Sequence, residues 1–388
     1  MTELLIRLFI KNPEDIGDPA VRERYGVMGG VTGIALNLLL FAAKFAAGII
    51  TASIAITADA FNNLSDAGSS IITVIGFRMA GRPADPDHPF GHGRIEYISG
   101  FVIAIIIMLM GVELFRASVQ KIINPEEVSL GLFTVIIMLA AVLIKLWMFF
   151  FNRKLGARID SAPMRAAATD SLSDAAATGV VLLGLGVTYF TGWLIDGYLG
   201  VLVSLFILYA GFGAARDTLN PLLGQPPKPE LVHKIQDMVM AHEMVSGIHD
   251  LVVHDYGPGR LMISLHVEVP SDRDILEIHD EIDLIETELR EELDCLATIH
   301  MDPIAVNDAF TVGLREKVAE LATALDAELM IHDFRVVPGP THTNLIFDVV
   351  VPASFRLSDE EVVKAMRRAV KEIGPQYFAV IQVDQSYV

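Results

Sequence analysis

The sequence predicts an α-helical membrane domain of six transmembrane helices, followed by a soluble α+β tail. Three observations support this fold class: long apolar segments in the first half, an uneven distribution of charge, and an internal repeat in the second half. Of the 388 residues, 52% are hydrophobic and only 20% are charged, which excludes an intrinsically disordered chain. The single cysteine, Cys295, excludes an intramolecular disulfide and a cysteine metal cluster.

Six apolar segments approach or exceed the roughly 20 residues that a helix needs to cross a bilayer. They are residues 28–50, 55–79, 97–120, 129–151, 162–190 and 193–213. Lysines and arginines concentrate in the second and fourth connections, for example Arg82, Arg94 and Lys154, and such residues favour the cytoplasmic side. We therefore expect a multi-pass protein of the cell membrane with both termini in the cytoplasm. The first 25 residues are polar and do not resemble a signal peptide.

The net charge of −19 is concentrated in the second half of the chain. Residues 1–213 carry 15 basic and 17 acidic residues, a net charge of −2, whereas residues 214–388 carry 14 and 31, a net charge of −17. An acidic tail repels nucleic acid and anionic lipid, and it favours cationic ligands. We expect no nucleic-acid partner.

Charged and amide side chains inside the apolar segments carry the most functional information. Asp170 and Asp174 are spaced i, i+4 and so share one helix face, and Asn62 and Asp66 have the same spacing. An ionised aspartate in a bilayer costs about 3 kcal/mol and usually faces an interior pathway or a partner. Two such pairs would surround one cation with oxygen atoms. No lysine or arginine lies within either motif.

A structural alternative remains for these aspartates. They would then be helix caps or would bond to neighbouring serines, and Asp59 is the weakest candidate of the group. The sequence indicates no partner for the other charged residues in the apolar segments, which are Lys44, Glu96, Glu113, Lys145 and Asp196.

The second connection offers a further ligand set, Asp85, His88 and His92. Pro83, Pro86 and Pro89 favour a loop here rather than a helix. The alternative is a solvated loop with two surface histidines.

These motifs together resemble those of the cation diffusion facilitator family. The resemblance rests on ADAFNNLSDAGSS, PADPDHPFGHGRIE and ATDSLSDAAAT, and on a tail that begins with GIHDL and ends with IHMDP, and it covers roughly residues 26–304. Members of this family are homodimeric exporters of divalent metal ions driven by proton antiport. The resemblance implies a transport site formed by Asn62, Asp66, Asp170 and Asp174, and it implies that the loop with His92 binds metal in some members. In the tail it implies cytosolic metal ligands at His249, His266, His279, His300 and Asp302.

The tail contains a repeat with an offset of 82 to 83 residues. Residues 247–270 return as 330–352, and residues 296–306 return as 378–388. Each copy is predicted to run helix, strand, turn, strand, helix, strand, with helices near 229–243, 272–293, 308–325 and 358–373. By the resemblance, each copy is a ferredoxin-like, metallochaperone-like unit. In the second copy the equivalent positions carry mainly oxygen donors: His332, Asp348, Glu361, Gln382 and Asp384.

The predicted domain boundaries follow from these patterns. They are a cytosolic N-terminal segment over 1–25, the transport domain over 26–213, a linker over 214–229, and two cytosolic α+β domains over 230–304 and 305–388.

The ligand types indicate which metal is the substrate. Three carboxylates and one amide are hard oxygen donors, which suit Mn²⁺, Mg²⁺ and Ca²⁺, whereas imidazole favours Zn²⁺. An Asn-Asp-Asp-Asp quartet also resembles the manganese-exporting branch of the family. We therefore expect a secondary transporter that exports Mn²⁺ in exchange for protons, with no cofactor. Zn²⁺, Fe²⁺, Co²⁺ and Cd²⁺ remain open as substrates.

One alternative from another class is a membrane-anchored metal receptor that does not transport. An enzyme is not expected, because the sequence has no phosphate-binding loop, nucleophile elbow or metalloprotease helix.

Overall fold

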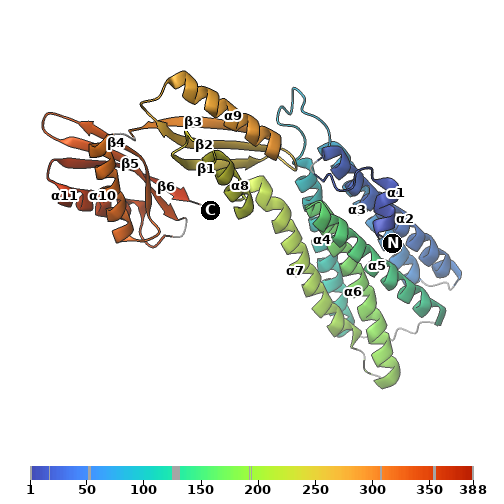
Figure 1. The fold of residues 1–388 in the computed structure, drawn as a ribbon. Coiled ribbons are helices and arrows are strands. Elements are labelled where there is room, and N and C mark those ends of the chain that lie inside the picture. The colour runs from blue at the N-terminus through green and yellow to red at the C-terminus, as the bar shows by residue number, and fades with distance from the viewer. Residues whose placement is uncertain are drawn as a thin grey trace. The chain divides into compact units, whose positions relative to one another are not determined.

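The computed structural model describes residues 2–16, 18–50, 54–124, 132–191, 193, 195–305, 308–352 and 355–386. These residues form two units, and the first consists mainly of seven helices (Figure 1). The units are Met1–Gln225 with Asp255–Arg260, and Pro226–His254 with Leu261–Val388. The helices of the first unit are α1 Thr2–Phe9, α2 Pro19–Ile50, α3 Ile54–Ala80, α4 Ile95–Ile123, α5 Leu132–Arg158, α6 Ala162–Thr191 and α7 Asp196–Leu223.

The six long helices, α2 to α7, coincide with the six predicted apolar segments. Within the described residues, four of them are long and apolar enough to cross a membrane: Ala20–Ala47, Ile95–Ile123, Val135–Arg158 and Gly197–Leu223. The other two, α3 and α6, carry the predicted aspartate motifs. The structure therefore supports several spans, while the count of six is not confirmed.

The predicted linker over 214–229 is too long. Helix α7 continues to Leu223 and ends at Gly224, whose φ of +85° is the left-handed conformation that glycine adopts at a helix C-terminus. The apolar pattern ends near 213, but the helix continues through polar residues because helix formation does not require an apolar face on every turn.

Two contacts join α2 to neighbouring helices of the first unit. Helix α2 packs closely on α3, because a Cβ atom on Gly30 would lie 2.5 Å from Cγ2 of Val74. Helix α2 is also tied to α4, since Arg22 donates two hydrogen bonds to Glu96, of 3.0 and 2.8 Å. Glu96 is 2% exposed. This residue, for which the sequence indicates no partner, therefore forms a buried ion pair with Arg22.

The second unit consists of two repeats with the same element order. The first contains α8 Pro229–Met240, β1 Gly247–Asp255, β2 Leu261–Pro270, α9 Ile275–Leu293 and β3 Cys295–Ile304, and the second contains α10 Ala309–Leu325, β4 Met330–Pro338, β5 Thr343–Pro352, α11 Asp359–Ile373 and β6 Tyr377–Ser386. The sheets have the orders β1-β2-β3 and β4-β5-β6 (Figure 1). The predicted helix–strand–strand–helix–strand pattern is confirmed in both repeats.

The two repeats share one register. Strands β2 and β3 are parallel with Leu261 opposite Cys295, and β5 and β6 are parallel with Thr343 opposite Tyr377, each 82 residues later. The finer description as ferredoxin-like units is not confirmed. A ferredoxin-like unit has a strand before its first helix, whereas each repeat here begins with a helix and its described sheet has three strands.

Each sheet has one face packed on its own helices. In the first repeat Ile263, Leu265 and Val267 join the helix side chains in one apolar core, and in the second Leu345 and Phe347 do so. Because side chains alternate along a strand, the intervening residues lie on the opposite, open face of each sheet. The predicted metal ligands of the tail belong to these open faces.

Phe347→Ala should destabilise the second repeat by about 3–5 kcal/mol, because it empties a fully buried position. Hydrogen exchange of the β5 and β6 amides in the full-length protein measures this loss. Phe310→Ala, at a position that is 56% exposed, is the matched control and should leave the exchange nearly unchanged. Equal exchange in the two variants would contradict this assignment of the core.

Candidate functional site

Three aspartates from two helices meet inside the first unit. One carboxylate oxygen from each of Asp66, Asp170 and Asp174 lies within 4.8 Å of the others. All three side chains are buried, with exposed fractions of 2%, 8% and 7%. The i, i+4 spacing of Asp170 and Asp174 directs both toward α3, as the sequence predicts.

A lysine from a third helix lies in this cluster. The Nζ atom of Lys145, on α5, is 2.7 Å from Oδ2 of Asp66 and 2.5 Å from Oδ2 of Asp174. The two carboxylates therefore share one buried ammonium group. The sequence does not indicate a partner for Lys145, although an ionisable residue in an apolar segment is itself a signal of function. Along the sequence, no basic residue lies within the two motifs, but the fold brings Lys145 to both of them.

The fourth predicted ligand is placed differently. Asn62 is exposed, whereas its neighbour Asn63 is 2% exposed. Both residues lie about one helical turn before Asp66, so either spacing is compatible with the same cluster. The assignment of Asn62 stays a prediction, and Asn63 is its competitor. The side chain of Asp59 lies outside the described residues.

Two of the neighbouring serines bond to the backbone rather than to the aspartates. Ser171 and Ser173 donate their hydroxyl hydrogens to the carbonyl oxygens of Ala167 and Thr169, one turn back in their own helix. The alternative in which serines satisfy the carboxylates therefore receives no support from these two residues. The cluster is instead held by Lys145.

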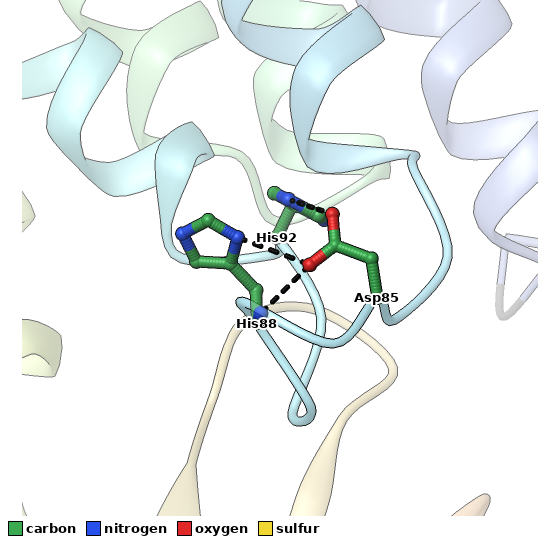
Figure 2. A group of neighbouring side chains, drawn as sticks. All are labelled: Asp85, His88 and His92. Carbon is green, nitrogen blue, oxygen red and sulfur yellow. Dashed lines mark hydrogen bonds and ion pairs between the residues drawn. The ribbon is translucent and has the colours of Figure 1, made fainter.

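The loop between α3 and α4 brings its three predicted ligands together (Figure 2). Oδ1 of Asp85 is 3.2 Å from Nδ1 of His88, and Oδ2 is 3.3 Å from Nε2 of His92. The backbone N–H of His88 also donates to Asp85, and this bond lowers the pKa of the carboxyl. His92 is only 9% exposed and lies 3.1 Å from the carbonyl oxygen of Pro83. Backbone hydrogen bonds between Asp85 and His88 close a turn, in which two imidazoles lie beside one carboxylate.

In the first tail repeat, three of the five predicted ligands converge. Oδ2 of Asp302 lies 3.2 Å from Nε2 of His249 and 2.8 Å from Nδ1 of His266. Nε2 of His300 is 3.3 Å from the other oxygen of Asp302, at the rim of the group. His279 lies apart on α9, where it is exposed and contacts Asp283.

In the second repeat, the equivalent positions form a similar group. His332, Asp348 and Asp384 gather on the open face of its sheet. Burial lowers the pKa of His332, and burial beside Asp384 raises the pKa of Asp348 to about 6. Gln382 donates to Asp384 from the rim, and Glu361 forms a capping box with Ser358 at the start of α11.

The two open faces meet. The imidazole rings of His249 and His332 stack with centroids 4.2 Å apart and planes 19° from parallel. Glu268, which the sequence did not single out, also joins the repeats. It is 2% exposed, pairs with Arg315 at 3.1 Å and accepts a hydrogen bond from the backbone N–H of Asp333.

Comparison with known proteins places these sites in a family. The chain matches the cation efflux transmembrane domain over residues 31–223 and the cation efflux protein cytoplasmic domain over residues 227–304. It is 30% identical over 277 residues to an uncharacterized transporter of Methanocaldococcus jannaschii, which covers 70% of this chain and 96% of the relative. The chain belongs to the cation diffusion facilitator, or cation efflux, family.

A second relative of this cation efflux protein is the cation-efflux pump FieF of Escherichia coli, which is 28% identical over 277 residues, 71% of this chain and 92% of the pump. The family consists of transporters rather than enzymes, so that prediction is confirmed. Both family matches end by residue 304, before α10, so the second tail repeat lies outside them.

Lys145→Met should destabilise the metal-free protein by about 3–5 kcal/mol, because it leaves two buried carboxylates without their cation. Thermal unfolding in detergent at mildly alkaline pH measures the loss. Added Mn²⁺ should stabilise this variant more than the parent protein, since it supplies the missing positive charge.

Lys154→Met is the matched control, because Lys154 pairs with Glu3 at a half-exposed position and such pairs contribute at most about 1 kcal/mol. If both lysine variants unfold at the same temperature, Lys145 does not hold the cluster.

Proposed function

We propose that this protein exports divalent metal ions from the cytosol in exchange for protons, with Mn²⁺ as the preferred substrate. Family membership supports cation efflux. The observation that carries the finer proposal is the convergence of Asp66, Asp170 and Asp174, which places three hard, anionic donors inside one helical unit. A divalent cation is the ligand that such a buried cluster accommodates.

The choice of metal rests on donor chemistry. The cluster of Asp66, Asp170 and Asp174 offers oxygen atoms, and an asparagine at 62 or 63 would add another. Carboxylate and amide oxygens favour Mn²⁺, whereas Zn²⁺ prefers sites with imidazole or thiolate. Zn²⁺, Fe²⁺, Co²⁺ and Cd²⁺ are the alternative substrates, because oxygen sites are permissive.

Proton exchange follows from the charges of the cluster. Three ionised carboxylates carry −3 and the Lys145 ammonium supplies +1. In our proposal an incoming M²⁺ takes the position beside Asp66 and Asp174, and the ammonium group moves aside. When the metal leaves outward, the ammonium returns and protons neutralise the remaining carboxylate charge. Lys145 thus acts as a tethered cation that holds the site between transport cycles.

The topology completes the proposal. All six helices α2–α7 cross the membrane, including α3 and α6, which carry the buried aspartates. The distribution of lysine and arginine supports cytoplasmic termini in the cell membrane. The match to the cytoplasmic domain of the family supports a homodimer. The exported metal also binds at the loop site of Asp85, His88 and His92 and at the tail sites. It does so before it enters the transport site or without entering it.

Asp66→Ala and Asp174→Ala should each reduce Mn²⁺ transport to the level of protein-free liposomes, because each removes a charged ligand. Proteoliposomes loaded with a metal indicator and a pH indicator measure metal uptake and proton movement together. Asp217→Ala, at an exposed position of α7, is the matched control and should transport normally.

Transport near the parent level in Asp66→Ala would contradict the transport site. If folded parent protein gives no metal-dependent pH change with Mn²⁺, Zn²⁺ or Fe²⁺, the alternative of a metal receptor without transport is favoured instead.

Asn62→His and Asn63→His test which asparagine contacts the ion. An imidazole at the ligand position should raise Zn²⁺ transport relative to Mn²⁺ transport, because Zn²⁺ favours nitrogen donors. We expect the change in one variant, with the other as its control. The ratio is measured in vesicles at matched protein levels. An unchanged ratio in both variants would remove the amide from the proposed ligand set.

A further inference from the structure

The open face of the second-repeat sheet gathers three ligand-type side chains from three strands. His332 lies on β4, Asp348 on β5 and Asp384 on β6. One nitrogen of His332 and one oxygen of each aspartate lie within 4.8 Å of one another. The parallel register of β5 and β6 and the bulge that follows His332 in β4 produce this convergence. Bulges commonly redirect a side chain in this way.

Three buried polar atoms of this group have no hydrogen-bond partner among the described residues. His332 is 9% exposed, and neither of its ring nitrogens has a hydrogen-bond partner among the described residues. Oδ2 of Asp384 is likewise buried and unpartnered there. Leaving buried polar atoms unsatisfied is unfavourable, so these three atoms indicate a missing ligand.

The two ring nitrogens of His332 each lie near a different aspartate. Nε2 is 3.6 Å from Oδ2 of Asp384, and Nδ1 is 4.0 Å from Oδ2 of Asp348. Both distances are too long for hydrogen bonds. Because one ion can bind only one nitrogen of an imidazole, the site takes the single His332 nitrogen that lies within 4.8 Å of one oxygen of each aspartate.

The same trio borders the first-repeat ligands. His332 stacks on His249, and His249 lies with His266 and Asp302 in the other ligand group. Both repeats also place an aspartate with positive φ directly after this histidine, at Asp250 and Asp333 with φ of 51° and 50°. The two groups are therefore built alike and lie back to back across the stacked rings.

We propose that His332, Asp348 and Asp384 bind a second divalent metal ion in the tail. A single chain then holds two tail ions at the junction of its repeats, one on each open sheet face. One imidazole and two carboxylates suit Zn²⁺ and Mn²⁺. The site does not depend on metal export, and it lies outside the residues that match the family.

Zinc binding to the full-length protein tests this site. The Asp66→Ala background disables the proposed transport site, so the result is independent of whether the protein transports. Zinc bound per chain is measured by equilibrium dialysis and mass spectrometry in detergent. His332→Ala should lose one equivalent of Zn²⁺ relative to His342→Ala, an exposed histidine in the same repeat. His266→Ala should lose a different equivalent and leave the second-repeat ion bound.

Asp384→Asn guards against misfolding, because it keeps the shape of the side chain while removing its charge. It should lose the same equivalent as His332→Ala, with an unchanged circular dichroism spectrum. If His332→Ala and Asp384→Asn both bind as much zinc as His342→Ala, the proposed site does not exist. Loss of all tail zinc in His266→Ala would also overturn it, since the ions would then not occupy separate sites.

Discussion

The ion-pair cluster of Lys145 with Asp66 and Asp174 is the constraint on which the helical unit depends. Carboxylates from α3 and α6 converge where little solvent reaches them, and such an arrangement is strongly unfavourable without a cation. The ammonium from α5 supplies that charge and joins three helices. In the proposed transport cycle, Lys145 balances the carboxylate charge while no metal is bound.

The tail solves a similar problem by duplication. Each repeat buries one face of its sheet under its own helices and leaves polar side chains on the other. The two repeats meet where His249 stacks on His332 and where Glu268 accepts a hydrogen bond from the neighbouring repeat. One chain thereby builds an interface between two related units, with histidines and aspartates rather than apolar residues at its centre.

The candidate sites differ in how far the sequence predicted them. The loop with Asp85, His88 and His92 was predictable, because its ligands are close along the chain and the prolines favour a loop there. The pairing of Asp170 with Asp174 followed from helix periodicity. Lys145 was not assigned, because it is 29 residues from Asp174 and 79 from Asp66. Nothing in local spacing reports which faces of α3, α5 and α6 meet.

By itself, the sequence determined the long helices, the αββαβ order of both repeats and the alternation of core and polar residues along the strands. These features follow from local periodicity, which is set by the geometry of single helices and strands. Only the tertiary structure decided that Lys145 neutralises the aspartates, that Asn63 rather than Asn62 is buried, and that the two sheets meet at their ligand faces. Those outcomes depend on packing between elements far apart in the chain, where burial and charge balance select one arrangement among many that local patterns allow.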